Sequence, residues 1–228
     1  MIVGRGLIAT AFDRYRAQAD VTLFCSGVSN SLEQNPKAFF REQKLLKQTL
    51  KNTNNALFVY FGTCSVYDPS TRNSAYVQHK LKMEKIVSES GRPYIIFRIP
   101  QIVGSSANQS TLLNYLYEKI SNENSFELWA GAVRYLVDID DVVQFVSFVI
   151  DDVKKFCVVI NLITLPCKVI DIVKIIEKIT GKKAKYTLVD TGVSYSIPVE
   201  KTSVSVYEAD ITVDKNYVNH VLRKYYQR

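Results

Sequence analysis

Segments with the apolar patterns of strands and helices alternate along the first half of the chain. Runs rich in β-branched and aromatic residues at 21–26, 56–63 and 94–98 have the length of buried strands. The intervening segments 37–51 and 76–90 carry apolar residues at helical spacing. Strands that alternate with helices form parallel sheets with helices on both faces. The pattern therefore predicts an α/β fold with a parallel sheet.

The N-terminal segment 2–12 combines a short apolar strand, a glycine turn and the start of a helix. Gly4, Gly6 and Ala9 form the pattern Gly-x-Gly-x-x-Ala of dinucleotide-binding folds. In that pattern the first glycine makes the turn, the second admits a pyrophosphate to the backbone, and the small third residue lets the helix pack on the strand. A glycine turn between an ordinary strand and helix is the alternative. The apolar helix start that follows directly favours the cofactor site.

A second candidate site surrounds the strand that ends at Thr63. Tyr76 and Lys80 are four residues apart on the expected helix that follows, so they share one helical face. A nearby ammonium favours the phenolate and lowers the pKa of a tyrosine toward neutrality. The Thr63 hydroxyl could hold a substrate oxygen while Tyr76 exchanges its proton. Because Tyr-x-x-x-Lys is common by chance, a surface Tyr/Lys pair and a capping threonine are the alternatives.

The two candidate sites are expected to meet at one edge of the sheet. Ligands of parallel sheets bind beyond the carboxyl ends of the strands. Gly4, Gly6, Gly27, Thr63 and Pro100 all follow predicted strands. The sequence therefore predicts a single ligand site at this edge.

Composition narrows the class of protein. The 228 residues suffice for one domain with a large core, and the net charge of +7 comes from dispersed lysines and arginines. This dispersion favours a solvated surface over nucleic-acid binding, although a basic cleft for a phosphorylated ligand fits the same charge. The four cysteines form no C-x-x-C pair and the two histidines lie far apart, so free thiols and no metal site are expected. With no apolar run of ~18 residues and no leader segment, we expect a cytoplasmic protein without membrane contact.

Taken in their order along the chain, the motifs resemble those of the extended short-chain dehydrogenase/reductase family. This family comprises the NAD- or NADP-dependent nucleotide-sugar epimerases, dehydratases and reductases. The segments that carry the resemblance include 59–67, the Tyr76/Lys80 pair, 98–104 and 131–141. The resemblance implies a single Rossmann-like domain over 1–228. It also implies a small C-terminal α/β substrate-binding lobe, formed by about 105–140 and 164–228.

The resemblance also implies roles for individual residues. Tyr76 would be the general acid/base, Lys80 would lower its pKa and bind the nicotinamide ribose, and Thr63 would contact the reacting sugar. NAD or NADP would be bound by Gly4, Arg5, Gly6, Leu7, Ile8, Ser26, Gly27, Tyr76, Lys80, Pro100, Gln101 and Ile102. The nucleotide sugar would be bound by Cys64, Ser65, Leu112 and Arg134.

One departure from the family changes these expectations. The family places two more strands between the glycine-turn helix and the strand at 21–26, whereas here residues 14–20 join them almost directly. The missing part carries the residue that selects the adenosine ribose, so the choice between NAD and NADP stays open. Cys64 and Ser65 supply no acid pair beside Thr63, which favours epimerisation or ketone reduction over dehydration. A catalytically silent relative that serves as a binding or regulatory module is the alternative to an enzyme of surface-polysaccharide synthesis.

Loss of two strands would leave the glycine-turn strand at a sheet edge, where a second chain could cover it. The family commonly dimerises through the helices that correspond to 37–51 and 76–90. These segments offer several apolar residues, which are Phe39, Phe40, Leu46, Leu50, Leu81, Ile86 and Val87. We therefore expect a two-fold homodimer, with packing against the chain's own sheet as the alternative use of these residues.

Overall fold

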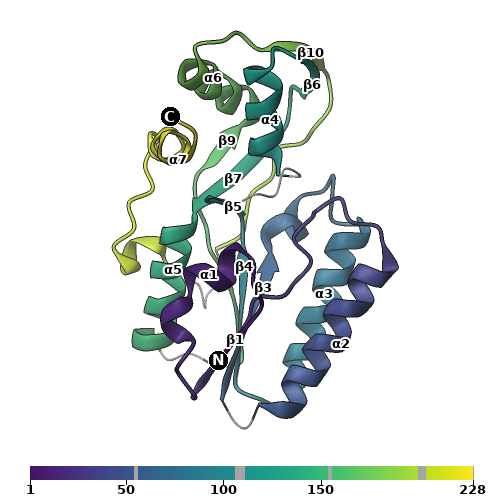
Figure 1. The fold of residues 1–228 in the computed structure, drawn as a ribbon, viewed down its shortest axis with the longest axis vertical. Coiled ribbons are helices and arrows are strands. Elements are labelled where there is room, and N and C mark those ends of the chain that lie inside the picture. Colours follow the sequence, from purple (N-terminus) through teal and green to yellow (C-terminus); the bar gives the residue numbers. More distant parts are fainter. Residues whose placement is uncertain (54–55, 106–110, 154–155, 200–203, 228) are drawn as a thin grey trace.

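A five-stranded parallel sheet forms the centre of the structure (Figure 1). The structure is a computed structural model, and it describes residues 1–53, 56–105, 111–153, 156–199 and 204–227. Each strand of the sheet pairs with its neighbours in parallel. In spatial order the strands are β1 (Ile2–Val3), β2 (Val21–Phe24), β3 (Leu57–Thr63), β4 (Tyr94–Ile99) and β8 (Val158–Asn161). The predicted α/β fold with a parallel sheet is confirmed.

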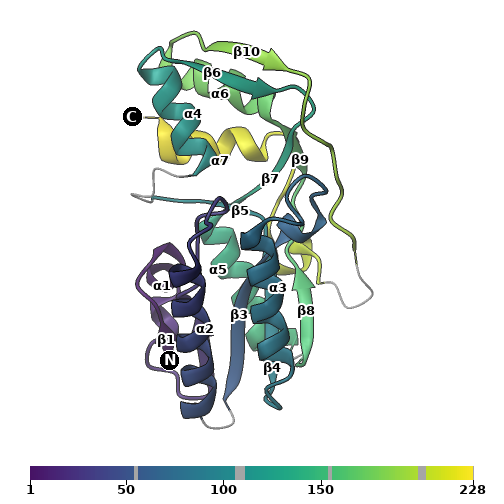
Figure 2. The ribbon, with the colours of Figure 1, turned by 90° about the vertical axis from the view of Figure 1, so that its right-hand side faces the viewer.

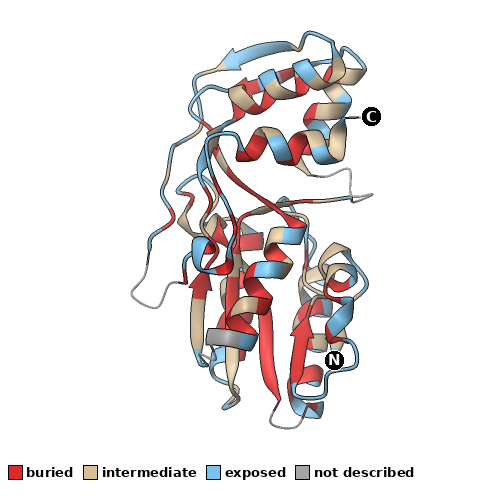
Figure 3. Ribbon diagram, turned by 90° about the vertical axis from the view of Figure 1, so that its left-hand side faces the viewer, coloured by how far each residue is buried: buried red, intermediate tan, exposed pale blue. Residues whose placement is uncertain are grey.

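Helices cover both faces of this sheet. One face carries α2 (Pro36–Asn52) and α3 (Ala75–Ser88), and the other carries α1 (Leu7–Ala11) and α5 (Ile139–Phe148), as Figure 1 shows. A 3-10 helix, η1 (Asp13–Tyr15), extends α1, and a π-helix, η3 (Val149–Val153), extends α5. Figure 3 shows that buried residues run along the strands of the sheet. Such burial on both faces is typical of parallel sheets and explains their continuous apolar runs in the sequence.

Local side chains fix where the two crossover helices begin. The Asn35 side chain accepts a hydrogen bond of 3.0 Å from the Lys37 amide, and Pro36 stands in the first turn of α2. Ser74 caps α3 in the same way by accepting from the Val77 amide at 3.2 Å. Both caps satisfy amides that lack partners within their own helix. They explain why the helices begin next to the predicted starts.

A second group of elements lies beyond the carboxyl ends of the main strands, at the top of Figure 2. It contains a three-stranded sheet, a two-stranded parallel pair and three helices among the described residues. The strands are β5 (Gln101–Val103), β7 (Val133–Asp138) and β9 (Pro166–Lys168), then β6 (Ser125–Trp129) and β10 (Lys185–Val189). The helices are α4 (Leu112–Ser121), α6 (Val169–Thr180) and α7 (Tyr217–Tyr226), with short turns η2 (Cys64–Tyr67) and η4 (Val206–Ala209) elsewhere. Apart from β5, these strands and the three helices lie within the segments 105–140 and 164–228 expected for the lobe, and the division into a domain with a lobe stays a prediction. Its parts at 106–110, 200–203 and 228 lie outside the described residues, and its role in binding substrate stays a prediction.

Ion pairs and tyrosine hydroxyls hold the C-terminal helix α7 against the start of α5. The Lys224 ammonium lies 2.7 Å from the Asp138 carboxylate and 2.6 Å from that of Asp140. The Tyr225 hydroxyl donates to Asp138 at 2.6 Å, and the Tyr217 hydroxyl donates to Asp141. This contact joins the second group of elements to the helix layer of the main sheet.

The strand β1 lies at an edge of the sheet and pairs only with β2. The connection between them contains only α1, η1 and a turn, so no further strand separates them. The shortened sheet that the sequence predicts is therefore confirmed. None of the described helices is both long enough and apolar enough to cross a membrane.

Most of the apolar residues of the helices proposed for a dimer interface pack against the chain's own sheet. Leu46, Leu50 and Val87 are buried in one cluster with residues of β2, β3 and β4. Phe40, by contrast, is 66% exposed. The remaining exposed face of α2 carries cations, which are Lys37, Arg41, Lys44, Lys47 and Lys51. A two-fold contact along α2 would bring these like charges together, and the homodimer stays a prediction.

Two substitutions on α2 separate the inward face from the outward face. Leu46→Ala removes a fully buried side chain, so it should lower the free energy of unfolding by about 2 to 5 kcal/mol. Phe40→Ala, two turns away and exposed, should change it by no more than about 0.5 kcal/mol. Urea unfolding followed by circular dichroism measures both values. A loss at Phe40 as large as that at Leu46 would contradict this packing and indicate that another chain covers Phe40.

Candidate functional site

The ends of β1 and β2 approach each other closely at Gly4. This residue has a φ of 140°, and a Cβ atom there would lie 2.6 Å from the Cys25 carbonyl oxygen and 3.1 Å from the Ser26 nitrogen. Only glycine tolerates both the dihedral and the contact. Gly6 follows at the start of α1, and a Cβ atom there would meet nothing within 4 Å. The turn therefore brings Gly4 and Ser26 together and leaves the backbone at Gly6 open, with Arg5 exposed beside it.

The end of β2 lies over the side chain of Lys80. A Cβ atom on Gly27 would lie 2.5 Å from the Lys80 Nζ atom. Lys80 is itself only 4% exposed. Its ammonium donates to Glu42 Oε1 at 3.4 Å, to the Tyr60 hydroxyl at 3.2 Å and to the Phe61 carbonyl at 3.3 Å. The structure thus brings Gly27 and Lys80 together, as predicted for one site, but surrounds the ammonium with protein acceptors.

The centre of this network is the fully buried carboxylate of Glu42, on α2. It accepts from the Val28 amide at 2.7 Å and from the Tyr60 hydroxyl at 2.8 Å. The Nε2 atom of His79 lies 3.0 Å away, and the His79 ring stacks on Phe39. Burial acts to raise the pKa of Glu42. Hydrogen bonds from His79, Val28 and Tyr60 and the charge of Lys80 outweigh it, and the pKa falls to about 2.

Glu42, Tyr60 and His79 form a cluster that the sequence analysis missed. Burial and the Glu42 charge raise the pKa of Tyr60 well above its usual value, so its hydroxyl remains a donor. One sequence signal for this cluster exists. Glu42 is the sole acid of α2, and it stands one turn before the buried Leu46, on the apolar face of the helix. A charged residue at such a position requires buried partners.

Tyr76 lies on the same helix as Lys80 and packs between the two neighbouring loops. Its ring is 9% exposed and belongs to a cluster with Val28, which follows Gly27, and with Val66 of η2. Among the described residues no hydrogen-bond partner contacts its hydroxyl. Tyr76 is therefore a buried side chain near the strand ends, with a phenol that the protein leaves unbonded.

The Thr63 hydroxyl has partners within its own loop. It donates to the Ser65 hydroxyl at 3.0 Å and accepts from the Ser65 amide at 3.1 Å, so it caps the turn η2. The capping alternative for Thr63 is thus present in the structure. Ser65 lies directly beside Thr63, as expected for neighbours in one site.

The residues expected to bind the nucleotide sugar have different surroundings. Arg134 of β7 donates to its neighbouring carbonyl at 2.8 Å and lies 4.0 Å from the buried Asp68 carboxylate, in the loop after η2. The Cys64 thiol points inward, where it donates to the Arg98 carbonyl at 3.2 Å, and burial raises its pKa to about 12. Leu112 packs partly against the core at the start of α4. Arg134 is therefore the member of this set that reaches across from the second group of elements to the Thr63 loop.

Two further contacts complete the edge. Gly104 lies against Leu7, since a Cβ atom on Gly104 would be 3.2 Å from the Leu7 side chain. The segment that contains Pro100, Gln101 and Ile102 therefore leads directly to the start of α1, where Leu7 and Ile8 lie. The segment 190–199 packs Ile197 in one cluster with Cys64 and Tyr135. The Tyr135 hydroxyl donates to the Tyr195 carbonyl at 2.7 Å, which holds this segment in place. Tyr195 and Ile197 are neighbours of the site that the sequence did not reveal.

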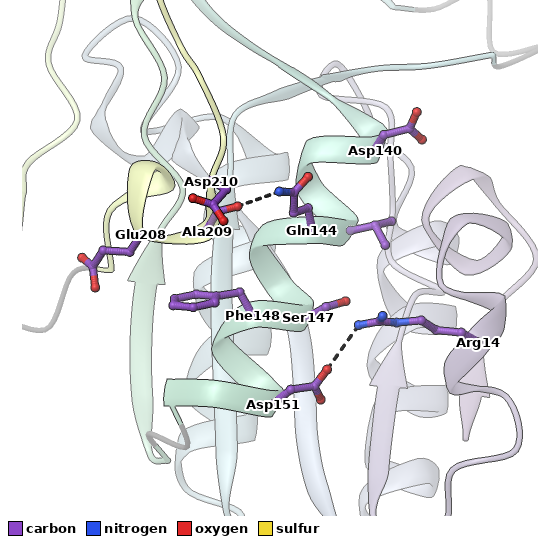
Figure 4. A pocket seen from close by; sticks show the side chains of 10 residues that line it. Arg14, Asp140, Gln144, Ser147, Phe148, Asp151, Glu208, Ala209 and Asp210 are labelled. Atoms are coloured by element: carbon purple, nitrogen blue, oxygen red, sulfur yellow. Dashed lines mark hydrogen bonds and ion pairs between the residues drawn. The ribbon is translucent and has the colours of Figure 1, made fainter.

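A cavity of about 490 Å³ lies away from this edge, between η1, α5 and η4 (Figure 4). None of the predicted site residues lines it. Arg14 crosses toward Asp151 at 3.3 Å, and the Gln144 amide donates to the Ala209 carbonyl at 2.7 Å. The other charged residues that line the cavity, Asp140, Glu208 and Asp210, are all acidic. This surplus of negative charge disfavours phosphate groups, so the cavity does not replace the strand-end site for a dinucleotide.

The depressed pKa of Glu42 predicts an acid-sensitive contribution to stability. A carboxyl with a pKa of about 2 in the folded chain and 4.5 in the unfolded chain stabilises the fold above pH 4.5 and loses that effect as the pH falls toward 2. Between about pH 5 and about pH 3 the free energy of unfolding should fall by about 2 kcal/mol through this group. Urea titrations at the two pH values measure the loss.

The double variant Glu42→Gln/Lys80→Met should lack this share of the loss, because it removes the titrating group together with its partner. Glu89→Gln is the matched control, since the Glu89 side chain is 65% exposed and pairs with Lys85 at the surface. It should lose as much stability as the wild type. Equal losses in all three proteins would contradict the role of Glu42.

Comparison with known proteins identifies the family. A model of the NAD dependent epimerase/dehydratase family matches residues 6–161. Among curated proteins no match is found. Many solved structures share the fold.

Three of these structures illustrate the similarity. UDP-glucuronic acid 4-epimerase from Bacillus cereus, complexed with UDP-glucuronic acid and NAD, is 18% identical with a TM-score of 0.66, over 92% of this chain and 75% of that one. dTDP-glucose 4,6-dehydratase from Bacillus anthracis, complexed with NAD, is 14% identical with a TM-score of 0.67, over 96% and 77%. RMD from Pseudomonas aeruginosa, complexed with NADPH, is 15% identical with a TM-score of 0.64, over 86% and 89%.

At these identities the structures establish a shared fold. The family match spans α1, the Tyr76/Lys80 helix and β8, which is well over half of the chain. The chain belongs to the NAD dependent epimerase/dehydratase family.

Proposed function

We propose that this protein is an NAD- or NADP-dependent oxidoreductase or epimerase that acts on a nucleotide-activated sugar. The observation that carries the proposal is the phenol of Tyr76. It is buried between the loops that follow β2 and β3, and it has no hydrogen-bond partner among the described residues. A proton donor and acceptor that the protein leaves unbonded, in a chain of this family, is suited to exchange a proton with a substrate oxygen.

The glycine turn supports a dinucleotide at the same edge. No side chain fills the space beside Gly6 at the start of α1, where a phosphate would meet the backbone amides that open the helix. The similar structures hold NAD or NADPH at their sites. When bound, a nicotinamide cofactor accepts or supplies a hydride. Residues 23–26, which lie ~20 residues after the glycines, carry no acidic ribose ligand, so the choice between NAD and NADP rests on other residues.

The remaining site residues of the proposal orient the sugar nucleotide. Thr63 and Ser65 form a pair of hydroxyls at the end of β3, on the side of the Tyr76 loop. Arg134 would hold the diphosphate. Its ion-pair partner in the described parts of the chain, Asp68, lies at the long distance of 4.0 Å and leaves the guanidinium available. The similar structures act on or bind UDP- and dTDP-sugars. Since Cys64 and Ser65 carry no carboxyl group, epimerisation or ketone reduction is favoured over dehydration. A role in cytoplasmic surface-polysaccharide synthesis is part of the same proposal.

A catalytically silent relative is the second candidate, and two observations favour it. The sheet ends at β1, so the strands that carry the adenosine contacts in the family are missing. The Lys80 ammonium is also occupied by protein acceptors. A binding or regulatory module would retain the fold and the glycine turn without turning over a substrate.

Ligand binding to the purified protein tests the cofactor. NAD or NADP at millimolar concentration should raise the thermal midpoint of unfolding, because a ligand that binds only the native state stabilises it. UDP- and dTDP-sugars should raise it further in the presence of the dinucleotide. AMP and inorganic phosphate serve as controls for unspecific anion binding. No shift with either dinucleotide would contradict the proposed enzyme and leave the silent relative as the better explanation.

Replacement of the proposed acid/base tests the chemistry. Tyr76→Phe should lower turnover by about 10² to 10⁴ while the dinucleotide affinity changes little, because only the proton-exchanging oxygen is lost. The absorbance of reduced nicotinamide and chromatography of the nucleotide sugar measure turnover. Tyr207→Phe is a control at an exposed tyrosine far from the site. Full activity in Tyr76→Phe would contradict the mechanism.

A further inference from the structure

The outward face of α2 carries a stripe of exposed cations. The stripe consists of Lys37, Arg41, Lys44, Lys47 and Lys51. At 3.6 residues per turn, these five residues and Phe40 fall within about one third of the helix circumference, over a length of about 20 Å. The only acid of α2, Glu42, is buried on the opposite side together with Leu46. The outward face of the helix is therefore purely cationic.

The cations of the α2 stripe have no counter-charges. Among the described residues, no carboxylate lies within ion-pair distance of any of the five. Exposed lysines of other helices do have acidic neighbours. Lys85 pairs with Glu89 on α3, and Lys174 pairs with Asp171 on α6. The net charge of the whole chain is +7, so this one helix face holds a large share of the surplus and produces a local positive field.

The neighbouring helix extends this positive surface. α3 lies beside α2 on the same face of the sheet (Figure 1), and its exposed residues include Lys82 and Lys85 as well as Glu89. The cations therefore belong to the outside of a two-helix layer. Tyr76 is buried and the glycine turn lies at the strand ends, so neither belongs to this surface. A partner bound to the stripe would leave the proposed site open.

An exposed aromatic ring stands within the stripe. Phe40 is 66% exposed, and it borders a surface hollow of about 320 Å³ whose other lining residues are Gln43, Lys44, Lys47, Gln48 and Lys51. A single exposed phenylalanine is common on proteins, but here three lysines surround the same hollow. Aromatic rings combined with lysines on one helix are typical of helices that lie in the interface of a lipid bilayer.

The chemistry of the stripe discriminates between kinds of anionic partner. A stable protein interface has an apolar core, whereas Phe40 is the only large apolar residue of α2 that is exposed. Nucleic-acid recognition adds base contacts or several stacked aromatics to the phosphate contacts, and the stripe offers one ring. A second copy would bring like charges together. An anionic bilayer needs only clustered cations and an apolar side chain at the headgroup boundary.

We propose that the outward face of α2 binds the surface of an anionic lipid bilayer. The five cations of the stripe contact the lipid headgroups, and the Phe40 ring enters the boundary between headgroups and acyl chains. The helix then lies parallel to the bilayer. The expectation of no membrane contact rested on the absence of an apolar spanning segment, and attachment at the surface needs none. This inference goes beyond the proposed function and does not depend on it.

Co-sedimentation with lipid vesicles tests the partner. At about 0.1 M salt, vesicles of equal parts phosphatidylglycerol and phosphatidylcholine should bind the purified protein about tenfold or more tightly than vesicles of phosphatidylcholine alone. At about 1 M salt this binding should weaken by about tenfold or more, because the Debye length shortens from ~10 Å to ~3 Å. Equal binding to both kinds of vesicle, or binding to neither, would overturn the proposal.

Charge reversal tests whether this face makes the contact. Lys44→Glu/Lys47→Glu places two acids within the stripe, so the affinity for the mixed vesicles should fall by about tenfold or more. Lys174→Glu/Lys178→Glu is the matched control, because it changes the net charge equally at two exposed residues of α6. The affinity of the control should stay within about threefold of the wild-type value. Equal losses in the two proteins would indicate binding through net charge and would overturn the proposal.

Fluorescence tests whether the Phe40 position enters the bilayer. The chain has one tryptophan, Trp129, which lies in β6 of the second group of elements. The variant Phe40→Trp/Trp129→Phe moves this fluorophore to the stripe. The mixed vesicles should shift its emission to shorter wavelengths, because the ring leaves water, whereas the emission of Trp129 in the wild type should not shift. An unshifted emission of the double variant would overturn the insertion of this side chain.

Other partners of the stripe would give distinct results. A DNA duplex of arbitrary sequence that binds as tightly as the mixed vesicles, and loses this binding in Lys44→Glu/Lys47→Glu, would overturn the assignment to lipid. A dimer in light scattering that becomes a monomer in Phe40→Asp would show that a second copy covers the stripe, and it would also overturn the proposal. Failure of NAD and NADP to bind would refute the proposed function and leave the vesicle result unaffected.

Discussion

The carboxylate of Glu42 joins four parts of the chain that are distant in sequence. It contacts the turn after β2 through Val28, the strand β3 through Tyr60, and the helix α3 through His79 and Lys80. A buried charge is tolerated only where several donors converge on it, because the low dielectric of the interior penalises any lone pair that remains unsatisfied. The relative position of α2, α3 and the ends of two strands is therefore set by one side chain as well as by apolar packing. The Tyr76 phenol, carried on the same stretch of α3, takes its place from this arrangement.

The sequence was sufficient for the elements whose pattern is local. The apolar runs of β2, β3 and β4 and the glycine turn at Gly4 appear where they were expected, because each depends on neighbouring residues. The order of motifs likewise predicted the shortened sheet with β1 at its edge. These features required no knowledge of long-range contacts.

The site depended on contacts that a sequence pattern does not encode. The position of Lys80 on one helical face with Tyr76 was predictable, but its pairing with Glu42 joins residues 38 positions apart. The direction of the Cys64 side chain follows from the turn η2, which rotates the chain at the end of β3 and points the thiol toward the Arg98 carbonyl. The segment 190–199 shows neither the apolar spacing of a helix nor the alternation of a strand. Its place beside Tyr135 is defined by side chains from another strand. The roles of these residues in catalysis and binding stay predictions.

The contact between Gly27 and Lys80 has a consequence for how relatives of this chain can diverge. A side chain larger than glycine at position 27 would collide with the ammonium, and it could be accommodated only if Lys80 were shortened or moved. A shortened lysine would in turn leave the Glu42 carboxylate without its counter-charge, so an uncharged residue would be needed there. Unless the Lys80 side chain moves aside, the three positions are therefore exchanged together. Intermediate sequences with a single replacement would pass through a less stable protein, which is a barrier to gradual change at this end of the sheet.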